Sequence, residues 1–547
     1  MNKRFLFLII VIAGGYSFLF SQLYKIQLLR GDYYLARAES QYLASGLIAA
    51  KRGTIYFSDK NGNKLAVAFE KNFPVIYAVP KVIDDAREAY NRLLQILPNI
   101  SPNLEKKFSD KSNSYVLLKR KAAQSVADKI TQENIKGVFS DSEPERFYQF
   151  GSLASHVLGF VGPNSGDNGK SGKYGLEKFY ESSLSGIPGK TEGGKLIQPQ
   201  NGEDLILTID PNIQKQAETL LKDLVKNYKA KAGVFIVEEP STGKILAMGG
   251  EPGFDPNNYS ESDVGNFLNP ALQKIYEPGS VIKIMTMSAG IDLGKITPDT
   301  TYVDKGMLVI NGLKIENHDF KTRGPHGLIT MTNVVENSLN LGAVFAESKI
   351  GNEAFRNYLV KFGFQDKTGI DLPGEVRGSL KPLFASYLPQ VNFATASFGQ
   401  GIAMTPIELI NAFALIANGG QMMRPYVNAA LGPKPLDVVI SSSTAKLVTQ
   451  MMISAVDKAQ VAKISGYSIA GKTGTAYVPD PKKKNYDTNK VVNTYVGFGP
   501  TSNPRFVILI KLDEPEGAPM AALTVVPAFH ELARFILNYY NVAPDRL

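Results

Sequence analysis

Ser280 and Lys283 stand three residues apart in the segment 277–290. On an α-helix, residues at this spacing share a face, so the hydroxyl and the amine can meet. Pro278 and Gly279 come directly before the serine and predict that a helix starts there. In the first turn of a helix, the positive end of the dipole favours a developing serine alkoxide. The pair therefore has the chemistry of a nucleophile beside its own base.

The neighbours of this pair are apolar, namely Val281, Ile282, Ile284, Met285 and Met287. Such neighbours predict a buried helix. Burial lowers the pKa of a lysine because its charged form loses hydration. A neutral Lys283 could then accept the hydroxyl proton of Ser280.

The Ser-x-x-Lys pattern is weak by itself, because Ser241 with Lys244 and Ser443 with Lys446 match it too. The turn-forming residues at 240–243 predict a hairpin at the first of these matches, with no helix to carry chemistry. A nucleophile therefore needs partners elsewhere in the chain.

Ser338 and Asn340 supply a second polar pair, in the helical segment 334–342. A turn at a helix end could aim both side chains into one cleft. A hydroxyl between two lysines can pass on a proton, and an amide can hold a substrate amide. This pattern is also weak alone, because Ser101 and Asn103 repeat its spacing.

The segment 468–478 has the composition of a strand and carries Lys472, Thr473, Gly474 and Thr475. Gly471 and Gly474 would let another part of the chain approach closely, because glycine has no side chain. The lysine offers a charge for a carboxylate, and the threonines offer hydroxyls. A backbone N–H of this strand, paired with that of Ser280, could form an oxyanion hole.

Two other matches compete with this interpretation. The triplet at 367–369 repeats Lys-Thr-Gly, but it lies in a turn-rich segment without a flanking strand, so we prefer Lys472. Residues 466–473 fit the phosphate-loop pattern, but such a loop must open a helix at its lysine. Pro479 and Pro481 exclude a helix there. We therefore predict no nucleotide binding.

Composition places the chain among globular proteins, with 44% hydrophobic and 20% charged residues. The length of 547 residues favours several domains over a single core. The net charge of +9 is modest, and no run of Lys and Arg is long enough to indicate nucleic-acid binding. The absence of cysteine excludes disulfides and thiol nucleophiles. The four histidines are too scattered in sequence to suggest a metal site, so we expect no metal and no cofactor.

The N-terminus predicts a membrane anchor. Lys3 and Arg4 precede an uncharged run at 5–24, and about twenty helical residues span the roughly 30 Å hydrocarbon core. Basic residues ahead of the run place 1–4 in the cytoplasm and the rest of the chain outside. A cleaved signal peptide is the alternative, but the run continues past its small residues at 13–15, which favours an uncleaved helix.

Behind the anchor, 25–50 are expected to form a helical stalk. Residues 54–57 and a run from Lys64 predict a hairpin around Asn61 and Gly62. Arg52, Arg146 and Glu177 either form an ion network between domains or remain solvated charges; the sequence does not choose. This region, 51–204, is expected to be a mixed α+β domain.

The region 205–547 is expected to form a second domain, in which strands flank a helical insert and a sheet is covered by helices. The expected elements are a strand at 205–210, a helix from Pro211, strands at 233–238, 244–249, 492–499 and 505–512, and a closing helix at 527–540.

Taken together, the three motifs resemble those of penicillin-binding proteins and serine β-lactamases. Longer segments resemble a class B penicillin-binding protein at 276–283, 394–402, 405–409 and 470–476. Segments 52–55, 156–162 and 175–177 resemble the N-terminal pedestal domain of that class. Segments 362–375 and 394–402 look more like the division enzyme than the elongation enzyme. One departure is Leu339, where the family commonly has a small residue. Its side chain should point away from the cleft, so we expect activity to survive.

The resemblance implies the α/β (α+β) penicillin-binding transpeptidase fold, with a central antiparallel sheet flanked by helices and a helical subdomain. It implies that Ser280 attacks the penultimate D-Ala carbonyl of a peptidoglycan stem peptide while Lys283 accepts its proton. Ser338 would pass a proton to the leaving D-Ala, and Asn340 would hold the peptide. The terminal carboxylate would be held at Lys472, Thr473, Gly474 and Thr475.

The implied partners are peptidoglycan stem peptides, β-lactams, the bacterial inner membrane, a membrane glycan polymerase and other cell-wall assembly proteins. The resemblance also implies a single-pass protein of the cytoplasmic membrane, with its catalytic domain on the outer face. Three alternatives remain open: a D,D-carboxypeptidase or β-lactamase on the same scaffold, an elongation transpeptidase, and a non-catalytic assembly protein that keeps the fold.

Overall fold

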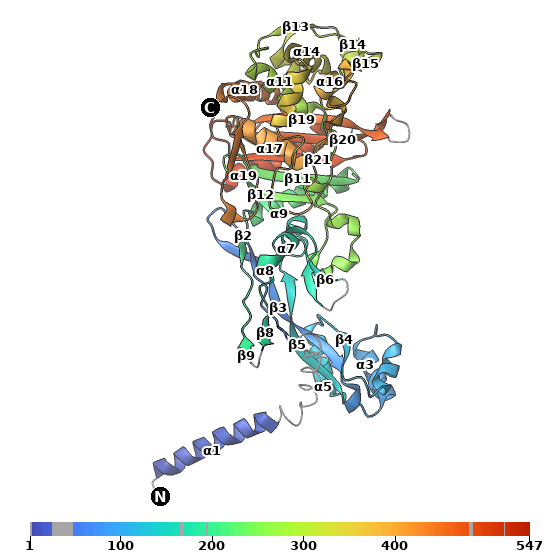
Figure 1. Ribbon diagram of the computed structural model, residues 1–547, viewed down its shortest axis with the longest axis vertical. Coiled ribbons are helices and arrows are strands. Elements are labelled where there is room, and N and C mark those ends of the chain that lie inside the picture. The colour runs from blue at the N-terminus through green and yellow to red at the C-terminus, as the bar shows by residue number, and fades with distance from the viewer. Residues whose placement is uncertain are drawn as a thin grey trace.

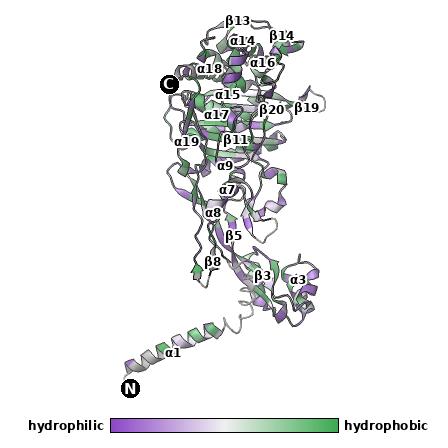
Figure 2. Ribbon diagram, in the orientation of Figure 1, coloured by the Kyte–Doolittle hydropathy of each residue, from purple (hydrophilic) through white to green (hydrophobic). Residues whose placement is uncertain are grey.

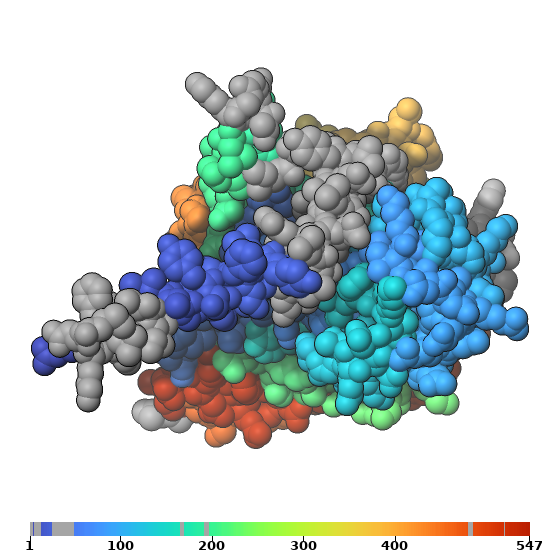
Figure 3. Space-filling model, turned by 90° about the horizontal axis from the view of Figure 1, so that it is seen from below, coloured from blue at the N-terminus to red at the C-terminus, as the bar shows by residue number. Residues whose placement is uncertain are grey.

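The computed structural model describes residues 3–24, 47–164, 169–192, 195–480, 485–518 and 520–546. Figure 1 shows an elongated molecule with helix α1 (Lys3–Tyr24) at one end and a large C-terminal domain at the other. The pedestal, residues 51–204, lies between them. Seen from the lower end, as in Figure 3, the blue and cyan residues of α1 and the pedestal occupy much of the surface. Of the helical stalk predicted at 25–50, only 47–50 belong to the described residues, and there the prediction is wrong, because Leu47–Ile48 form a strand that pairs with residues 189–190.

The helix predicted at 5–24 is present as α1, although the side chains of 5–11 lie outside the described part. Within that described part, no helix combines the length and the apolar character that crossing a bilayer requires.

The pedestal is organised by two long strands, β3 (Lys64–Ala78) and β5 (Val138–Tyr148), which pair antiparallel from Ala68 opposite Tyr148 to Ala78 opposite Val138. The predicted hairpin is confirmed, because β2 (Ile55–Ser58) pairs antiparallel with β3. Gly62 in its turn has a φ of +80°, a conformation that favours glycine.

Two more strands complete this sheet, in the order β10-β2-β3-β4 with β5 on β3. The strand predicted at 205–210 is shorter than expected. Only Leu205–Ile206 form a strand, β10, which pairs in parallel with β2 of the pedestal. Asp210 instead accepts hydrogen bonds from two N–H groups at the start of α9 (Pro211–Asn227), where proline is the first residue as predicted.

The remaining pedestal elements are short. They are β1 (Leu47–Ile48), η2 (Pro80–Val82), α3 (Ala86–Ile96), α4 (Asn103–Ser109), β4 (Val116–Lys119), α5 (Gln124–Glu133), α6 (Ser155–Leu158), β6 (Val161–Pro163), β7 (Lys170–Gly172), α7 (Gly175–Phe179), α8 (Glu181–Leu184), β8 (Gly189–Glu192) and β9 (Lys195–Ile197). Helices α3, α4 and α5 pack with the far ends of β3 and β5 around a separate small core. The pedestal is thus mixed α+β, as the sequence predicts.

The C-terminal domain is built on a five-stranded antiparallel sheet with the strand order β12-β11-β21-β20-β19. The strands are β11 (Ala232–Glu239), β12 (Lys244–Glu251), β19 (Ala470–Asp480), β20 (Asn485–Gly499) and β21 (Phe506–Asp513). The predicted strand pair at 233–249 and the two predicted final strands are confirmed. Because β11 and β12 precede the long insert while the other three strands follow it, the sheet joins the two ends of the domain.

Alternate residues of β11 face two different helical layers, as a strand requires. Phe235 and Val237 pack with α9 and with α19 (Val525–Tyr539), the predicted closing helix. Val234 and Ile236 belong to the core on the other face, which includes α17 (Pro406–Ala417). The hydrophobic residues, green in Figure 2, are frequent in this layered region.

The insert is the chain between β12 and β19; much of it forms the helical subdomain at the top of Figure 1, while its α17 packs on the sheet. Its helices are η3 (Pro256–Glu261), η4 (Val264–Phe267), α10 (Pro270–Gln273), η5 (Gly279–Ile282), α11 (Lys283–Asp292), α12 (Phe320–Arg323), α13 (Met331–Asn337), α14 (Asn340–Ile350), α15 (Asn352–Lys361), η6 (Lys381–Leu383), α16 (Gln390–Ala396), η7 (Ala429–Leu431) and α18 (Ser442–Ala459). Its strand pairs are β13 (Thr301–Asp304) with β16 (Gly327–Thr330), β14 (Met307–Ile310) with β15 (Leu313–Glu316), and β17 (Gln421–Met423) with β18 (Pro435–Val438). A short turn, η8 (Ala521–Leu523), precedes α19.

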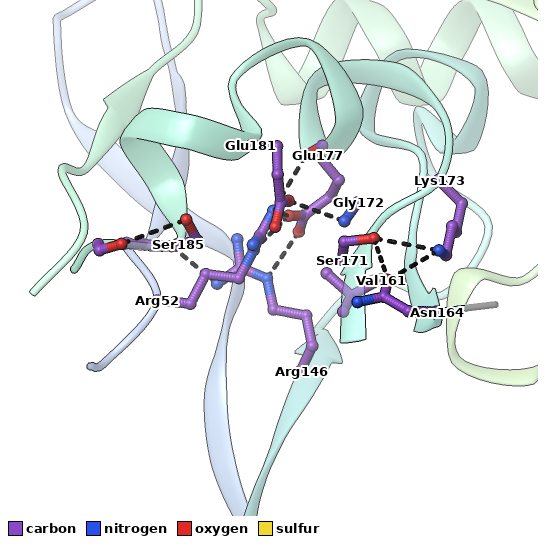
Figure 4. A network of polar contacts seen from close by, with 12 residues as sticks. Arg52, Arg146, Val161, Asn164, Ser171, Gly172, Lys173, Glu177, Glu181 and Ser185 are labelled. Atoms are coloured by element: carbon purple, nitrogen blue, oxygen red, sulfur yellow. Dashed lines mark hydrogen bonds and ion pairs between the residues drawn. The ribbon is translucent and has the colours of Figure 1, made fainter. Parts of the chain in front are cut away.

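Arg52, Arg146 and Glu177 form a buried ion network, which Figure 4 shows. The Glu177 carboxylate, fully buried, accepts from Arg146 Nε at 2.6 Å and from Arg52 Nε at 2.7 Å. Arg52 also contacts Glu181 at 2.7 Å. The network ties together β5, α7 and the segment that leads into β2, so it stabilises the pedestal internally. The neighbouring Tyr180 reaches the C-terminal domain, donating to Asp371 at 2.9 Å.

We expect Glu177→Ala to destabilise the protein by about 3–5 kcal/mol, because it leaves two buried guanidinium groups without their shared carboxylate. Thermal and urea unfolding of the purified protein measure the loss. The matched control is Glu133→Ala, which removes an exposed partner of Arg92 and should cost about 1 kcal/mol or less. Equal losses in the two variants would contradict the structural role assigned to Glu177.

Candidate active site

Ser280 lies on the 3₁₀ turn η5, which runs directly into α11. The predicted helix start is therefore confirmed. Gly279, just before the serine, has a φ of +62° and donates its N–H to the Gly399 carbonyl at 3.1 Å. A Cβ at this glycine would lie 3.2 Å from the Thr475 carbonyl oxygen. The serine is thus held on a tight turn pressed against β19.

Lys283 is fully buried at the start of α11, among the apolar neighbours expected from the sequence. Its Nζ donates to Ser280 Oγ at 3.0 Å and to the Ser338 carbonyl at 2.5 Å. Burial, and next the positive charge of Lys472, hold the pKa of Lys283 well below its ordinary value. The nucleophile and a weakly protonated base therefore share one hydrogen bond.

Ser338 ends α13 in the left-handed conformation, with a φ of +55°. This turn aims its hydroxyl between the two lysines: Oγ lies 3.3 Å from Lys283 Nζ and 2.9 Å from Lys472 Nζ. Leu339, the departure from the usual motif, is fully buried in the hydrophobic core. Its side chain points away from the cleft, as expected.

Asn340 begins α14 and lines the cleft beside Ser338. Its Nδ2 donates to the Glu316 carbonyl at 2.8 Å, at the end of β15. This bond uses one of the two N–H groups of the amide. The other N–H and the carbonyl oxygen stay available for a ligand.

Lys472 lies on β19, the edge strand of the sheet, and is 4% exposed. Burial lowers its pKa to about 7. Besides Ser338, its Nζ contacts the Thr473 carbonyl at 3.1 Å. A Cβ at Gly474 would lie 2.6 Å from the Pro278 carbonyl, so glycine there permits the close approach that the sequence predicts.

The cleft that these residues line has a volume of about 1040 Å³. Ser280, Ser338 and Asn340 line it together with Thr473 and Thr475 of β19, while the two lysines lie buried behind the serine hydroxyls. The Thr475 hydroxyl accepts from the Ala521 N–H at 3.3 Å, which holds the loop before α19 at the rim. The three predicted motifs therefore meet in a single groove.

Several lining residues were not singled out as site residues from the sequence. They are residues 313–319 of the β14–β15 arm, Lys321, Glu336, Asn337, Thr395, Phe398, Gln400, Tyr477, Thr488, Asn489, Val491, Pro515, Gly517, Ala518, Met520, Ala521 and Ala522. Among these, Thr395, Phe398 and Gln400 belong to segment 394–402, whose resemblance to the family indicates a functional role. No sequence pattern indicates that the β14–β15 arm lines a site, because its alternating side chains are those of any exposed hairpin.

The competing motifs are explained by local structure. Ser241 and Lys244 flank the turn between β11 and β12, as predicted, and Ser443 is exposed on α18. Thr368 donates to Glu375 at 2.6 Å, in an irregular segment without a strand. The phosphate-loop match begins β19 where a helix would be needed. Within the described residues, no group of three or more metal-ligating side chains is placed to hold an ion.

Known proteins share this architecture and these motifs. The family model of the penicillin-binding protein transpeptidase domain matches residues 233–532, and that of the penicillin-binding protein dimerisation domain matches 47–196. Stage V sporulation protein D of Bacillus subtilis is 30% identical, over 100% of this chain and 87% of its own length. Peptidoglycan D,D-transpeptidase FtsI of Escherichia coli is 26% identical, over 100% and 93%.

Among solved structures, penicillin-binding protein 3 of Mycobacterium tuberculosis, complexed with aztreonam, superposes with a TM-score of 0.68. It is 26% identical and covers 92% of this chain and 99% of its own. Penicillin-binding protein 2X of Streptococcus thermophilus, 23% identical with a TM-score of 0.72 over 91% of this chain and 81% of its own, shares the fold. The resemblance stated from the motifs is thereby confirmed, and the chain belongs to the penicillin-binding protein transpeptidase family, with a dimerisation domain as its pedestal.

Proposed function

We propose that this protein is a serine-type peptidoglycan D,D-transpeptidase that cross-links stem peptides through an acyl-enzyme. The observation that carries the proposal is the continuous hydrogen-bonded chain Ser280 Oγ, Lys283 Nζ, Ser338 Oγ and Lys472 Nζ at one cleft. A nucleophile, its base and a relay to a second cation are the groups that acyl transfer needs.

In the first step, Ser280 Oγ attacks the carbonyl carbon of the penultimate D-Ala, and Lys283 takes the hydroxyl proton. The carbonyl oxygen becomes an oxyanion, which the backbone N–H groups of Ser280 and Thr475 stabilise. Collapse of this intermediate breaks the C–N bond. Ser338, placed between the lysines, passes a proton to the leaving D-Ala amine.

In the second step, the amine of another stem peptide attacks the ester carbon and Lys283 accepts the proton that the amine loses. Collapse breaks the ester C–O bond, and Lys283 returns that proton to Ser280 Oγ. Asn340 holds the peptide amide of the donor. Lys472, with the hydroxyls of Thr473 and Thr475 and the narrow passage at Gly474, holds the terminal carboxylate. A β-lactam carries both the reactive carbonyl and the carboxylate, so it would trap Ser280 as a stable ester.

The domain division that we propose is a cytoplasmic tail at 1–4, a membrane helix at 5–24, a stalk at 25–50, the pedestal at 51–204 and the transpeptidase domain at 205–547. The uncharged run behind Lys3 and Arg4 supports the anchor, which would hold the catalytic domain on the outer face of the cytoplasmic membrane. There it would work beside a membrane glycan polymerase, a partner that the resemblance to class B penicillin-binding proteins implies.

We further propose a septal role, supported by the resemblance of segments 362–375 and 394–402 to the division enzyme. Filamentous cells on depletion of the protein would agree with this role, whereas rounded cells would indicate elongation. A hydrolase on the same scaffold is the other candidate. Supplying the acyl-enzyme with an amine acceptor separates the two, because a carboxypeptidase passes the acyl group to water alone.

Ser280→Ala should abolish covalent labelling by a fluorescent penicillin, because the ester needs the serine oxygen. Mass spectrometry of the intact protein, followed by peptide mapping, locates the adduct in the wild-type chain. The control is Ser443→Ala, on the exposed face of α18, which should label normally. Persistent labelling of the first variant would place the nucleophile elsewhere.

Lys472→Ala should slow acylation by about 100-fold or more, because it removes the cation that holds the substrate carboxylate and contacts Ser338. Lys367→Ala provides the matched control, since the same Lys-Thr-Gly triplet there sits in an irregular loop. That control should acylate within about twofold of wild type. Stopped-flow measurement of the acylation rate compares the two variants. A large loss only in Lys367→Ala would place the carboxylate-binding triplet at 367–369.

The acylation rate should rise and then fall with pH. Because the pKa of Lys283 is lowered well below its ordinary value, the neutral base accumulates as pH rises through that lowered pKa. The pKa of Lys472 is about 7, so its charge is lost as pH rises further. Measuring the second-order rate constant from about pH 4 to about pH 9 tests this. A rate still climbing beyond about pH 8 would show that the charge of Lys472 is not needed.

A further inference from the structure

Asn317 follows β15 on the wall of the cleft, and its side chain has no role in the mechanism above. It is 3% exposed. Its Nδ2 donates to Asp304 Oδ1 at 2.9 Å, and its Oδ1 accepts from the Leu341 N–H at 3.1 Å. Both ends of the amide are occupied, so its two partners fix its orientation.

Asp304 ends β13 and is 1% exposed. Its Oδ1 also accepts from Tyr302 Oη at 3.0 Å, and its Oδ2 accepts from the His326 N–H at 2.9 Å. An ionised carboxylate can only accept hydrogen bonds. Asp304 therefore turns the NH₂ end of Asn317 toward itself, which directs the carbonyl end toward α14.

Helix α14 depends on this carbonyl. Its N-cap residue is Leu339, which has no side-chain acceptor and makes no capping bond. The Leu341 N–H is one of the first N–H groups of the helix, which have no partner within it. Asn317 caps it from 24 positions upstream, taking over what the N-cap residue of most helices does itself.

Glu316, the residue next to Asn317, also holds the start of α14. The Glu316 carbonyl accepts from Asn340 Nδ2 at 2.8 Å, so adjacent residues of the β15 arm hold both the backbone and the amide side chain at the start of α14. Ser338 lies two residues before Asn340, in a left-handed conformation that a non-glycine residue keeps only when its surroundings impose it.

We infer that Asn317 and Asp304 are positioning residues for acyl transfer: Asp304 orients the Asn317 amide, and Asn317 caps α14 so that Ser338 and Asn340 meet the substrate and the two lysines. This inference rests on the proposed function. Neither residue needs to touch the reacting atoms, and both act through the turn at 338–340.

The test exchanges the two side chains. Asn317→Asp removes the NH₂ donor and sets two carboxylates against each other, so the acylation rate constant with a fluorescent penicillin should fall by about 10- to 100-fold. Adding Asp304→Asn to the same chain supplies the NH₂ donor from the other side and keeps an acceptor for the Leu341 N–H. This double variant should recover to within about threefold of wild type.

Asn311→Asp is the matched control, because it makes the same substitution at the exposed tip of the same hairpin. It should acylate normally. If Asn317→Asp does not fold, as judged by its melting temperature, Asn317→Ala removes both bonds without adding charge and should show the same loss. A rate within twofold of wild type in the Asn317 variants, or no recovery in the double variant, would overturn the inference.

The wild-type adduct separates this inference from the proposed function. If penicillin labels Ser280 in the wild-type chain and the Asn317 variants label equally fast, only the positioning role fails. If the wild-type chain carries no adduct at Ser280, the proposed function fails first.

Discussion

Two buried lysines meet at one serine hydroxyl, and the rest of the C-terminal domain is arranged to make this possible. Lys283 and Lys472 both donate to Ser338 Oγ, at 3.3 and 2.9 Å. Burial lowers the pKa of both lysines below the ordinary value, and the positive charge of Lys472 lowers that of Lys283 further. Lys283 therefore loses its proton more easily than an exposed lysine, which gives the nucleophile a base.

The turns that carry Ser280 and Ser338 are both held by close contacts with neighbouring segments of the chain. The turn carrying Ser280 presses on β19 through Gly279 and Gly474, where a Cβ would meet carbonyl oxygens. The turn carrying Ser338 is left-handed and is held from outside by residues 316 and 317. The geometry of the cleft is thus set by close main-chain packing at the Ser280 turn and by the Asn317 side chain at the Ser338 turn.

The sequence predicts the parts of this site that depend on residue type and short spacing. It predicts Ser280 beside Lys283 on a helix start, the strand carrying Lys472, and the antiparallel sheet. It does not reveal the β14–β15 arm as a cleft wall, because Asn317 caps α14 across 24 positions, a distance at which no pattern operates. The strand expected at 205–210 is short because from Leu207 the chain takes up partners outside β2: that residue bridges to Asn428, and the Thr208 N–H donates to the Val427 carbonyl. The ion network that the sequence leaves open is formed, but within the pedestal.

The order of strands in the sheet has a consequence for biosynthesis. Strands β11 and β12 emerge first, but β21, the second partner of β11, begins only at Phe506, near the end of the chain. Until β21 has left the ribosome, the edge of β11 away from β12 has no partner, and the β19–β20 pair that carries Lys472 cannot join the sheet. Long-range pairing of this kind folds slowly and exposes unpaired edges meanwhile. The domain is therefore most vulnerable to proteolysis and misassembly during the interval between synthesis of the nucleophile and synthesis of the C-terminus.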